Sequence, residues 1–212
     1  MDERAYAIMM RMTIHPLFLP ILFSIVISGN VSYYALILSS LIIHEVGHIV
    51  AALICRVKVE RCVIMPYGGE IQLKGGNTIA PKKQLIIALG GPVATICCLA
   101  VTSFLDPLLA EPLVKIQILL LAINIIPIWP LDGGRIIMSL IHIFYPRIRM
   151  VEFYLSVSLI LITLTVIITF ILLPKTLFLL VLSIFLFFQI VNEWRYRKYR
   201  FAFEKHVIKR LT

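Results

Sequence analysis

The chain has 212 residues, of which 60% are hydrophobic and only 15% charged, and its formal net charge is +9. A soluble domain is about half apolar and about one quarter charged, and a globule this small exposes too much surface to hide the excess. These numbers argue against a soluble domain and favour a lipid environment. The four cysteines include no C-x-x-C spacing, which argues against a disulfide framework or a zinc knuckle.

Apolar runs long enough to cross a bilayer recur along the chain. A spanning helix needs roughly 20 mostly apolar residues, and candidates lie near 14–29, 33–55, 84–105, 113–131, 152–172 and 174–193. Pro107 and Pro112 mark the turn before the fourth run, and Pro127 and Pro130 should break that helix near its end. The first run has no A-x-A cleavage site, so we expect a retained span rather than a signal peptide. The sequence therefore predicts an all-α integral membrane protein with six transmembrane helices.

The basic residues support this arrangement. With six spans and both termini in the cytosol, 18 of the 20 Lys and Arg residues lie on the cytosolic side, and the exceptions are Lys115 and Lys175. This is the partition that the positive-inside rule requires. We expect residues 1–194 to form the six-span domain and 195–212 a basic cytosolic tail that attracts anionic lipid headgroups. No groove-reading motif accompanies the tail, which argues against nucleic-acid binding.

The segment between the second and third spans has a different texture. Val57–Met65 and Glu70–Leu73 are rich in β-branched and apolar residues, and Pro66-Tyr67-Gly68-Gly69 separates them. Such a pattern is typical of two strands joined by a turn. We expect a short β-hairpin or re-entrant loop on the cytosolic side, where its unpaired backbone could bind an extended peptide as an added strand.

His44-Glu45-Val46-Gly47-His48 is an H-E-x-x-H motif inside an apolar run. Residues four apart on a helix share a face, so both imidazoles can reach one metal ion. Glu45 projects about 100° round the helix from His44, where it can touch a metal-bound water. Ionisable groups inside a membrane helix cost about 3 kcal/mol each on insertion scales, and a metal ion compensates all three. The alternative is a polar patch that packs helices together, for which two histidines and a glutamate are an unusual choice.

A catalytic zinc ion usually takes three protein ligands and keeps one open position. Asp132 is the predicted third ligand, because it follows the prolines that unwind the fourth span and falls in the same inner half of the membrane as His44. Unwound backbone at that depth must be buried in protein or line a wet cavity. A helix-capping role is the alternative for Asp132, and His142, nearer the cytosolic loops, is the rival ligand.

Two motifs resemble those of the site-2 protease family of zinc intramembrane proteases. HEVGH (44–48) matches H-E-x-G-H, and NIIPIWPLDGG (124–134) matches N-x-x-P-x-x-P-L-D-G-G; MPYGGE (65–70) and LGGPV (89–93) also look like family features. The resemblance covers nearly the whole chain and implies a zinc-dependent intramembrane endopeptidase. Its implied roles are His44, His48 and Asp132 as ligands of one zinc ion, Glu45 as general base and proton donor, and Asn124 and Pro130 as substrate-positioning residues. An interhelical hydrogen bond is the alternative for Asn124.

The short six-span form, with I-H-P at 14–16, looks like the sporulation branch of that family. The likeness implies a membrane-associated pro-sigma factor, pro-sigma-K, as substrate, inhibitory membrane proteins as partners, and the forespore membrane, a bacterial inner membrane, as location. Two features depart from the branch: Val93-Ala94-Thr95 follows Gly91-Pro92 where the family often has Asn, and we expect no CBS domain after the last span. A metal-binding transporter or a non-catalytic pseudoprotease is the alternative function. The transporter would tolerate loss of Glu45, and the pseudoprotease would hold no zinc.

Overall fold

The computed structural model describes residues 11–14, 31–65, 68–73, 79–145, 147–173 and 176–211. The chain divides into two compact units, Met1–Ile126 and Pro127–Thr212.

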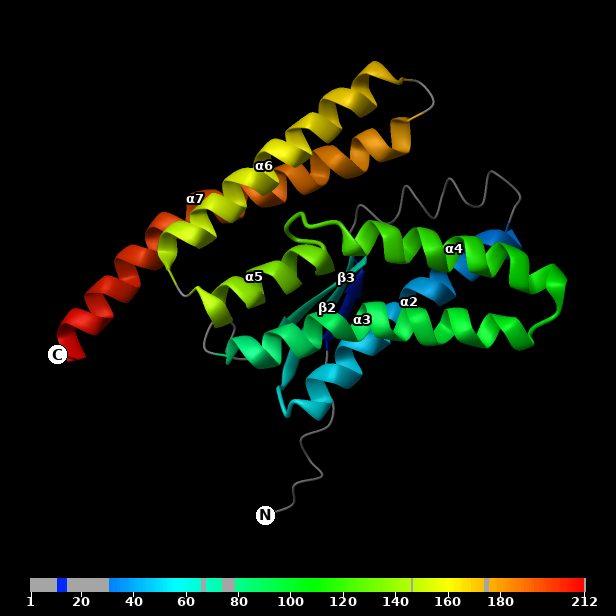
Figure 1. Ribbon diagram of the computed structural model, residues 1–212, viewed down its shortest axis with the longest axis horizontal. Coiled ribbons are helices and arrows are strands. Elements are labelled where there is room, and N and C mark those ends of the chain that lie inside the picture. Colours follow the sequence, from blue (N-terminus) through cyan, green and yellow to red (C-terminus); the bar gives the residue numbers. More distant parts are fainter. Residues whose placement is uncertain are drawn as a thin grey trace, which may run out of the picture. The chain divides into compact units, whose positions relative to one another are not determined.

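The helices of the first unit are α2 (Val31–Ile54), α3 (Pro81–Val101) and α4 (Pro107–Ile125), and a short 3-10 turn, η3 (Thr102–Phe104), follows α3. Each of the three helices contacts the other two, and α3 and α4 run side by side (Figure 1). This three-helix packing fixes the surroundings of the H-E-x-x-H segment, which lies in the second half of α2.

Prolines begin α3 and α4. Pro81 and Pro107 stand at the starts of these helices, where the missing N–H costs nothing. Asp106 caps α4 by accepting a hydrogen bond from the N–H of Leu108 at 2.9 Å. The predicted break near Pro127 is confirmed, since α4 ends at Ile125, but the prediction that Pro112 marks a turn is wrong, because Pro112 lies inside α4. It removes one hydrogen bond, to the carbonyl four residues earlier, so the loss falls in the first turns of the helix rather than at its centre.

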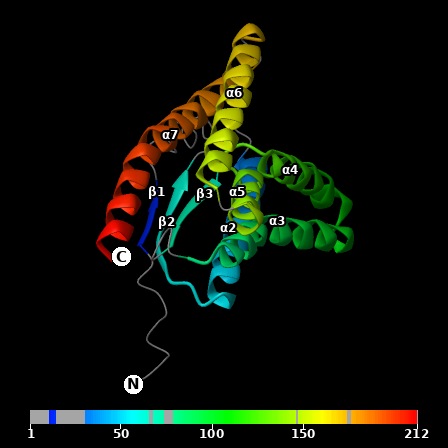
Figure 2. The ribbon, with the colours of Figure 1, turned by 60° about the vertical axis from the view of Figure 1, so that its left-hand side comes forward.

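A three-stranded sheet completes the first unit. Its strands are β1 (Arg11–Ile14), β2 (Val59–Met65) and β3 (Gly68–Leu73), in the order β1-β2-β3. β2 pairs with β3 in antiparallel fashion, and β1 pairs with β2 in parallel (Figure 2). The chain is mostly helical, as predicted, but β1 is a strand that the sequence did not indicate, in addition to the two strands expected between the second and third spans. β3 also packs against α2.

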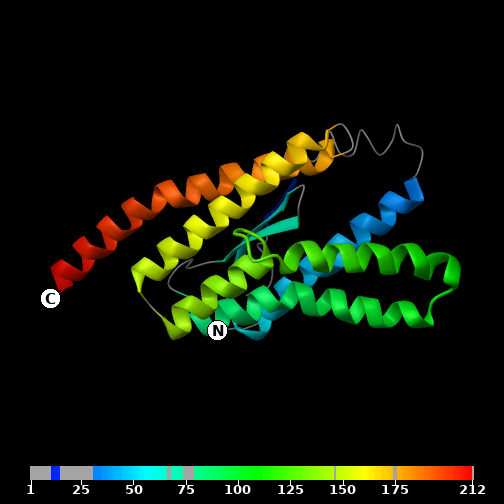
Figure 3. The same cartoon turned by 45° about the horizontal axis from the view of Figure 1, so that its top comes forward.

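The second unit consists of α5 (Asp132–Phe144), α6 (Ile148–Ile171) and α7 (Leu177–Leu211). α6 and α7 lie side by side (Figure 3), and a polar contact of 3.4 Å joins Thr169 Oγ1 on α6 to Ser183 Oγ on α7. The predicted basic tail begins within α7, whose helix continues unbroken to Leu211.

Many large apolar side chains of this protein are exposed and several polar ones are buried, unlike the pattern of a soluble domain. Phe104 and Leu108 are 89% and 84% exposed, whereas Gln117 and Ser158 are fully buried. Many exposed large apolar side chains together with buried polar ones fit lipid surroundings better than water. Within the described ranges, five helices are long and apolar enough to cross a membrane: Ser32–Ile54, Pro81–Phe104, Pro107–Ile125, Arg149–Ile171 and Leu179–Tyr196. The chain is therefore an integral membrane protein. The predicted span near 14–29 lies outside the described residues except for Ile14, which belongs to β1.

Candidate metal centre

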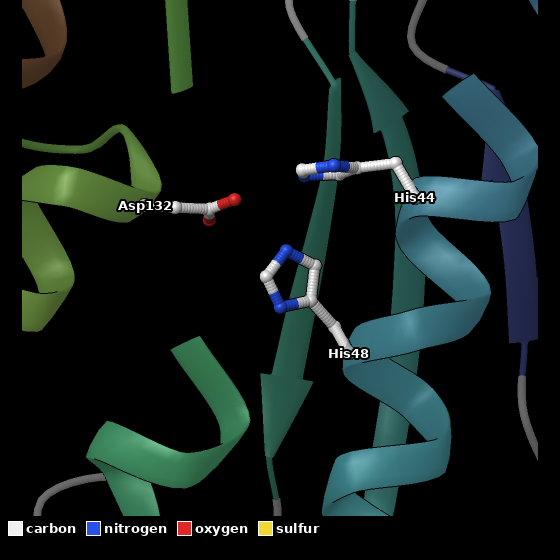
Figure 4. Close-up of side chains that lie close together, drawn as sticks. All are labelled: His44, His48 and Asp132. Carbon is white, nitrogen blue, oxygen red and sulfur yellow. The ribbon is translucent and has the colours of Figure 1, made fainter. Parts of the chain in front are cut away.

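His44 and His48 project from the same side of α2, one turn apart (Figure 4). Their side chains are 1% and 4% exposed. The two ring centroids are 5.0 Å apart, and the ring planes are inclined at 80°. Burying two imidazoles side by side in a membrane helix is costly unless their nitrogens have partners. Glu45 is the next residue after His44 on α2 and is half-buried.

The Nδ1 atom of His44 points to α3. It lies 2.8 Å from the hydroxyl oxygen of Thr95, and that hydroxyl also lies 3.1 Å from the carbonyl oxygen of Gly91, to which it can donate. The ring of His44 is therefore held on its Nδ1 side, so Nε2 is the ring nitrogen that would bind a metal ion.

The Nδ1 atom of His48 also points to α3. It lies 2.7 Å from the backbone carbonyl oxygen of Ile87 and 3.2 Å from the backbone nitrogen of Gly91. One ring nitrogen cannot both donate to the carbonyl and accept from the amide. We assign the contact with Ile87 as the hydrogen bond because it is 0.5 Å shorter. A carbonyl oxygen can only accept, so Nδ1–H is the donor. The Nε2 atom of His48 then carries the lone pair.

Two adjacent glycines allow α3 to approach α2 this closely. At Gly90, an added Cβ would lie 2.5 Å from the carbonyl oxygen of Gly47, so the two backbones touch where the helices cross. At Gly91, an added Cβ would collide with the Nε2 atoms of both His44 and His48. The absence of a side chain at Gly91 therefore keeps space open beside the two nitrogens that are left for a metal ion.

Asp132 is the first residue of α5 and is 5% exposed. A carboxylate is favoured at a helix N-terminus because the unpaired N–H groups and the helix dipole carry partial positive charge there. The turn before it is closed by a 2.9 Å hydrogen bond from the Leu131 amide to the Ile128 carbonyl. Gly134 fits tightly against this turn, since a Cβ there would lie 2.5 Å from the Ile128 carbonyl oxygen. The local fold thus fixes a buried carboxylate.

Among the residues that the structure describes, one group of His, Cys, Asp and Glu side chains could hold a metal ion, and it consists of His44, His48 and Asp132 (Figure 4). The three candidate ligand atoms lie within 4.8 Å of one another. Two imidazole nitrogens and one carboxylate oxygen are the kind of donor set that catalytic zinc takes, with water in its fourth position. The rival ligand His142 is exposed near the end of α5 and is not in this group.

The two predicted substrate-positioning residues are both buried, one in each unit. Asn124, on α4, is 6% exposed, and its side-chain amide donates to the Leu120 carbonyl at 3.1 Å. That bond is within the helix, so it is not the interhelical bond considered as the alternative. Pro130 lies between α4 and α5 and follows a cis peptide bond from Trp129.

The residues that orient the histidines were not among those predicted. Thr95 lies four residues after Gly91 and eight after Ile87, so all three share one face of α3. The sequence did contain a signal for Thr95: it stands four residues after Gly91 of the LGGPV segment, so the two share a helix face. The carbonyl of Ile87 leaves no sequence signal, because every residue has one.

Comparison with known proteins agrees with this geometry. Residues 32–109 match the family model of peptidase family M50. Stage IV sporulation protein FB of Bacillus subtilis is 25% identical over 209 residues, which cover 94% of this chain and 72% of that protein. Zinc metalloprotease MJ0392 of Methanocaldococcus jannaschii is 30% identical over 195 residues, which cover 84% of this chain and 55% of that protein.

A solved structure gives the same result. The site-2 protease from Methanocaldococcus jannaschii superposes with a TM-score of 0.65 and 26% sequence identity, covering 88% of this chain and 92% of that one. The matched family segment contains α2 and α3, and so includes both histidines and the residues that orient them. The match to peptidase family M50 over this segment and the likeness to the solved site-2 protease over most of the chain support a zinc metalloprotease of the site-2 protease type.

Proposed function

We propose that the protein is an endopeptidase that cuts membrane-associated substrates within the bilayer, with His44, His48 and Asp132 as the ligands of one zinc ion. The observation that carries this proposal is the buried histidine pair on α2. Both rings are engaged through Nδ1, at 2.8 Å and 2.7 Å, inside a helix apolar enough to span a membrane. A histidine pair held in this way is the ordinary arrangement of metal ligands, whose second nitrogen is oriented by a hydrogen bond.

The chemistry divides between the metal and Glu45. When bound, zinc polarises the scissile carbonyl and makes a water molecule acidic enough to attack near neutral pH. Glu45 is adjacent to His44 on α2 and half-buried, which supports its role as the general base. Its carboxylate accepts the proton from the attacking water and then gives that proton to the leaving amine nitrogen, so that the amine departs neutral.

The substrate has to be extended at the cut, because the backbone of a helix is shielded. The sheet order β1-β2-β3 leaves β3 with one neighbour among the described strands, and β3 packs against α2, which carries the histidines. An extended peptide could pair with the free side of β3 as an added strand. We assign Asn124 and Pro130 to substrate positioning as well. One amide hydrogen of Asn124 bonds to Leu120, and its remaining amide hydrogen and its oxygen are the groups that would bind substrate backbone.

The likeness to stage IV sporulation protein FB, which extends over 94% of the chain, supports a role in sporulation. We propose a membrane-associated pro-sigma factor, pro-sigma-K, as substrate and inhibitory membrane proteins as partners. The basic residues at Arg195 to Arg210 support a cytosolic C-terminus, which would place cleavage near the cytosolic face of the membrane around the forespore.

Co-expression with tagged pro-sigma-K tests both levels of the proposal. The wild-type chain should release a shortened product, and Glu45→Gln should abolish it at equal protein level. The matched control is Glu111→Gln, the same exchange at an exposed residue whose partner is Lys115 at 2.7 Å. It should cleave normally. Unchanged cleavage by Glu45→Gln would refute the protease mechanism. Cleavage of other membrane proteins but not of pro-sigma-K would refute only the proposed substrate.

A further inference from the structure

The hydrogen bonds of Thr95 point to a function for this residue in the metal centre. Thr95 lies on α3, is 1% exposed, and joins His44 to the backbone of its own helix. The hydroxyl of a threonine in a membrane helix often donates a hydrogen bond to the carbonyl four residues earlier. Thr95 can do this toward Gly91, and at the same time it contacts a histidine on another helix.

The hydroxyl of Thr95 has a single proton to donate. The Gly91 carbonyl, 3.1 Å away, can only accept. If Thr95 gives its proton to Gly91, its oxygen must accept the bond to His44 Nδ1 at 2.8 Å. Nδ1 then carries the hydrogen, and Nε2 carries the lone pair that a metal ion needs. If the hydroxyl turned to donate to Nδ1 instead, the hydrogen of the neutral ring would sit on Nε2 and block a metal ion.

We propose that Thr95 is a positioning residue of the zinc site. It holds His44 in the tautomer and orientation that present Nε2 to the metal. The proposal rests on His44 being a zinc ligand, as proposed above. His48 receives the equivalent support from the carbonyl of Ile87, at 2.7 Å. α3 therefore orients both histidines of α2, one through a side chain and one through the backbone.

The two supports differ in what a mutation can change. The Ile87 carbonyl is present whatever the side chain, whereas the Thr95 hydroxyl is lost in a single exchange. Loss of such a hydrogen-bond partner of a metal-bound histidine typically weakens metal binding by about 10- to 100-fold. We expect a loss of that size for Thr95→Val, which keeps the shape of the side chain and removes the oxygen.

The test is zinc affinity, measured on the full chain purified in detergent by competition with a chromophoric chelator. Thr95→Val should bind zinc about 10- to 100-fold more weakly than wild type, and Thr95→Ser, which keeps the hydroxyl, should restore most of the affinity. The absorption spectrum of the cobalt-loaded protein should change in Thr95→Val and not in Thr95→Ser. Thr102→Val is the matched control, because Thr102 is also buried and donates only to the backbone, at Leu99.

The outcomes separate this inference from the proposed function. Wild-type affinity in Thr95→Val would overturn the role of Thr95 and leave the zinc site standing, as would a Thr95→Ser variant as weak as Thr95→Val. If Thr95→Val does not fold, Thr95→Ala replaces it in the comparison with Thr95→Ser, since alanine favours the helix and lacks the oxygen. A wild-type chain that binds no zinc would refute the proposed function itself, and this inference with it.

Discussion

A single methyl group at Gly91 should disable the metal centre. The Cβ atom of Gly91→Ala would lie 2.5 Å from His44 Nε2 and closer still to His48 Nε2, whereas ordinary van der Waals contact begins at 3.4 Å. Both rings would have to move away by roughly an ångström to reach ordinary contact. They cannot do so freely, because His44 is tied to Thr95 at 2.8 Å and His48 to Ile87 at 2.7 Å.

The size of the effect follows from these two hydrogen bonds. Breaking one and leaving a buried polar group without its partner costs about 1–3 kcal/mol, which corresponds to roughly 5- to 150-fold in affinity. If the rings keep these bonds instead, the methyl group occupies the space beside both Nε2 atoms. In either case we expect Gly91→Ala to lose at least about fivefold in zinc affinity and to lose its proteolytic activity.

The assay measures the unfolding temperature of the detergent-purified protein with and without zinc. A ligand that binds the folded state raises this temperature, so Gly91→Ala should lose the increment that zinc gives to wild type. Gly90→Ala should fail differently, because its Cβ would meet the backbone of Gly47 at 2.5 Å, and the metal-free protein itself should unfold at lower temperature. Val93→Ala, at a position 53% exposed on α3, should match wild type. A full zinc increment in Gly91→Ala would refute this account of the site.

Two further predictions concern the metal and the packing of the second unit. Removing zinc with a strong chelator should abolish cleavage, and added zinc should restore it while magnesium should not, because two imidazoles and one carboxylate suit zinc; cleavage that persists in chelator would contradict a metal-dependent mechanism. Ile190→Ala on α7, where the side chain is fully buried, should cost about 2–5 kcal/mol in denaturant unfolding. Ile171→Ala, at a position 73% exposed on α6, should cost much less, and equal losses would show that the buried face of α7 has been assigned wrongly.

The parts of the fold that local patterns determine were predictable. Apolar length located α2, α3, α6 and α7, and the proline at 127 correctly predicted where α4 stops. β1 could not be found in this way, because it is four residues long and pairs with β2 about fifty residues later in the chain. Such pairing depends on tertiary contacts that no short window of sequence contains.

In the metal centre, too, local sequence predicted some residues and tertiary packing determines the others. The spacing of His44 and His48 on one helix is a property of the sequence, and the buried Asp132 follows from the break after α4. The supports supplied by α3 are different, because they depend on how closely two helices approach. Gly90 and Gly91 permit that approach, but nothing in their identity shows which ring nitrogen meets which oxygen. The tautomers of both histidines are therefore properties of the packed structure alone.

The support of both histidines by α3 also has a consequence for how the enzyme is made. The contacts of His44 with Thr95 and of His48 with Ile87 both lie between α2 and α3, within the first 126 residues. Both histidines and the residues that support them are therefore synthesised before Asp132, the proposed third ligand. A nascent chain at that stage offers only two nitrogens to a metal ion. With Asp132 as the third ligand, secure retention of zinc and proteolytic activity would require the second unit as well as the first.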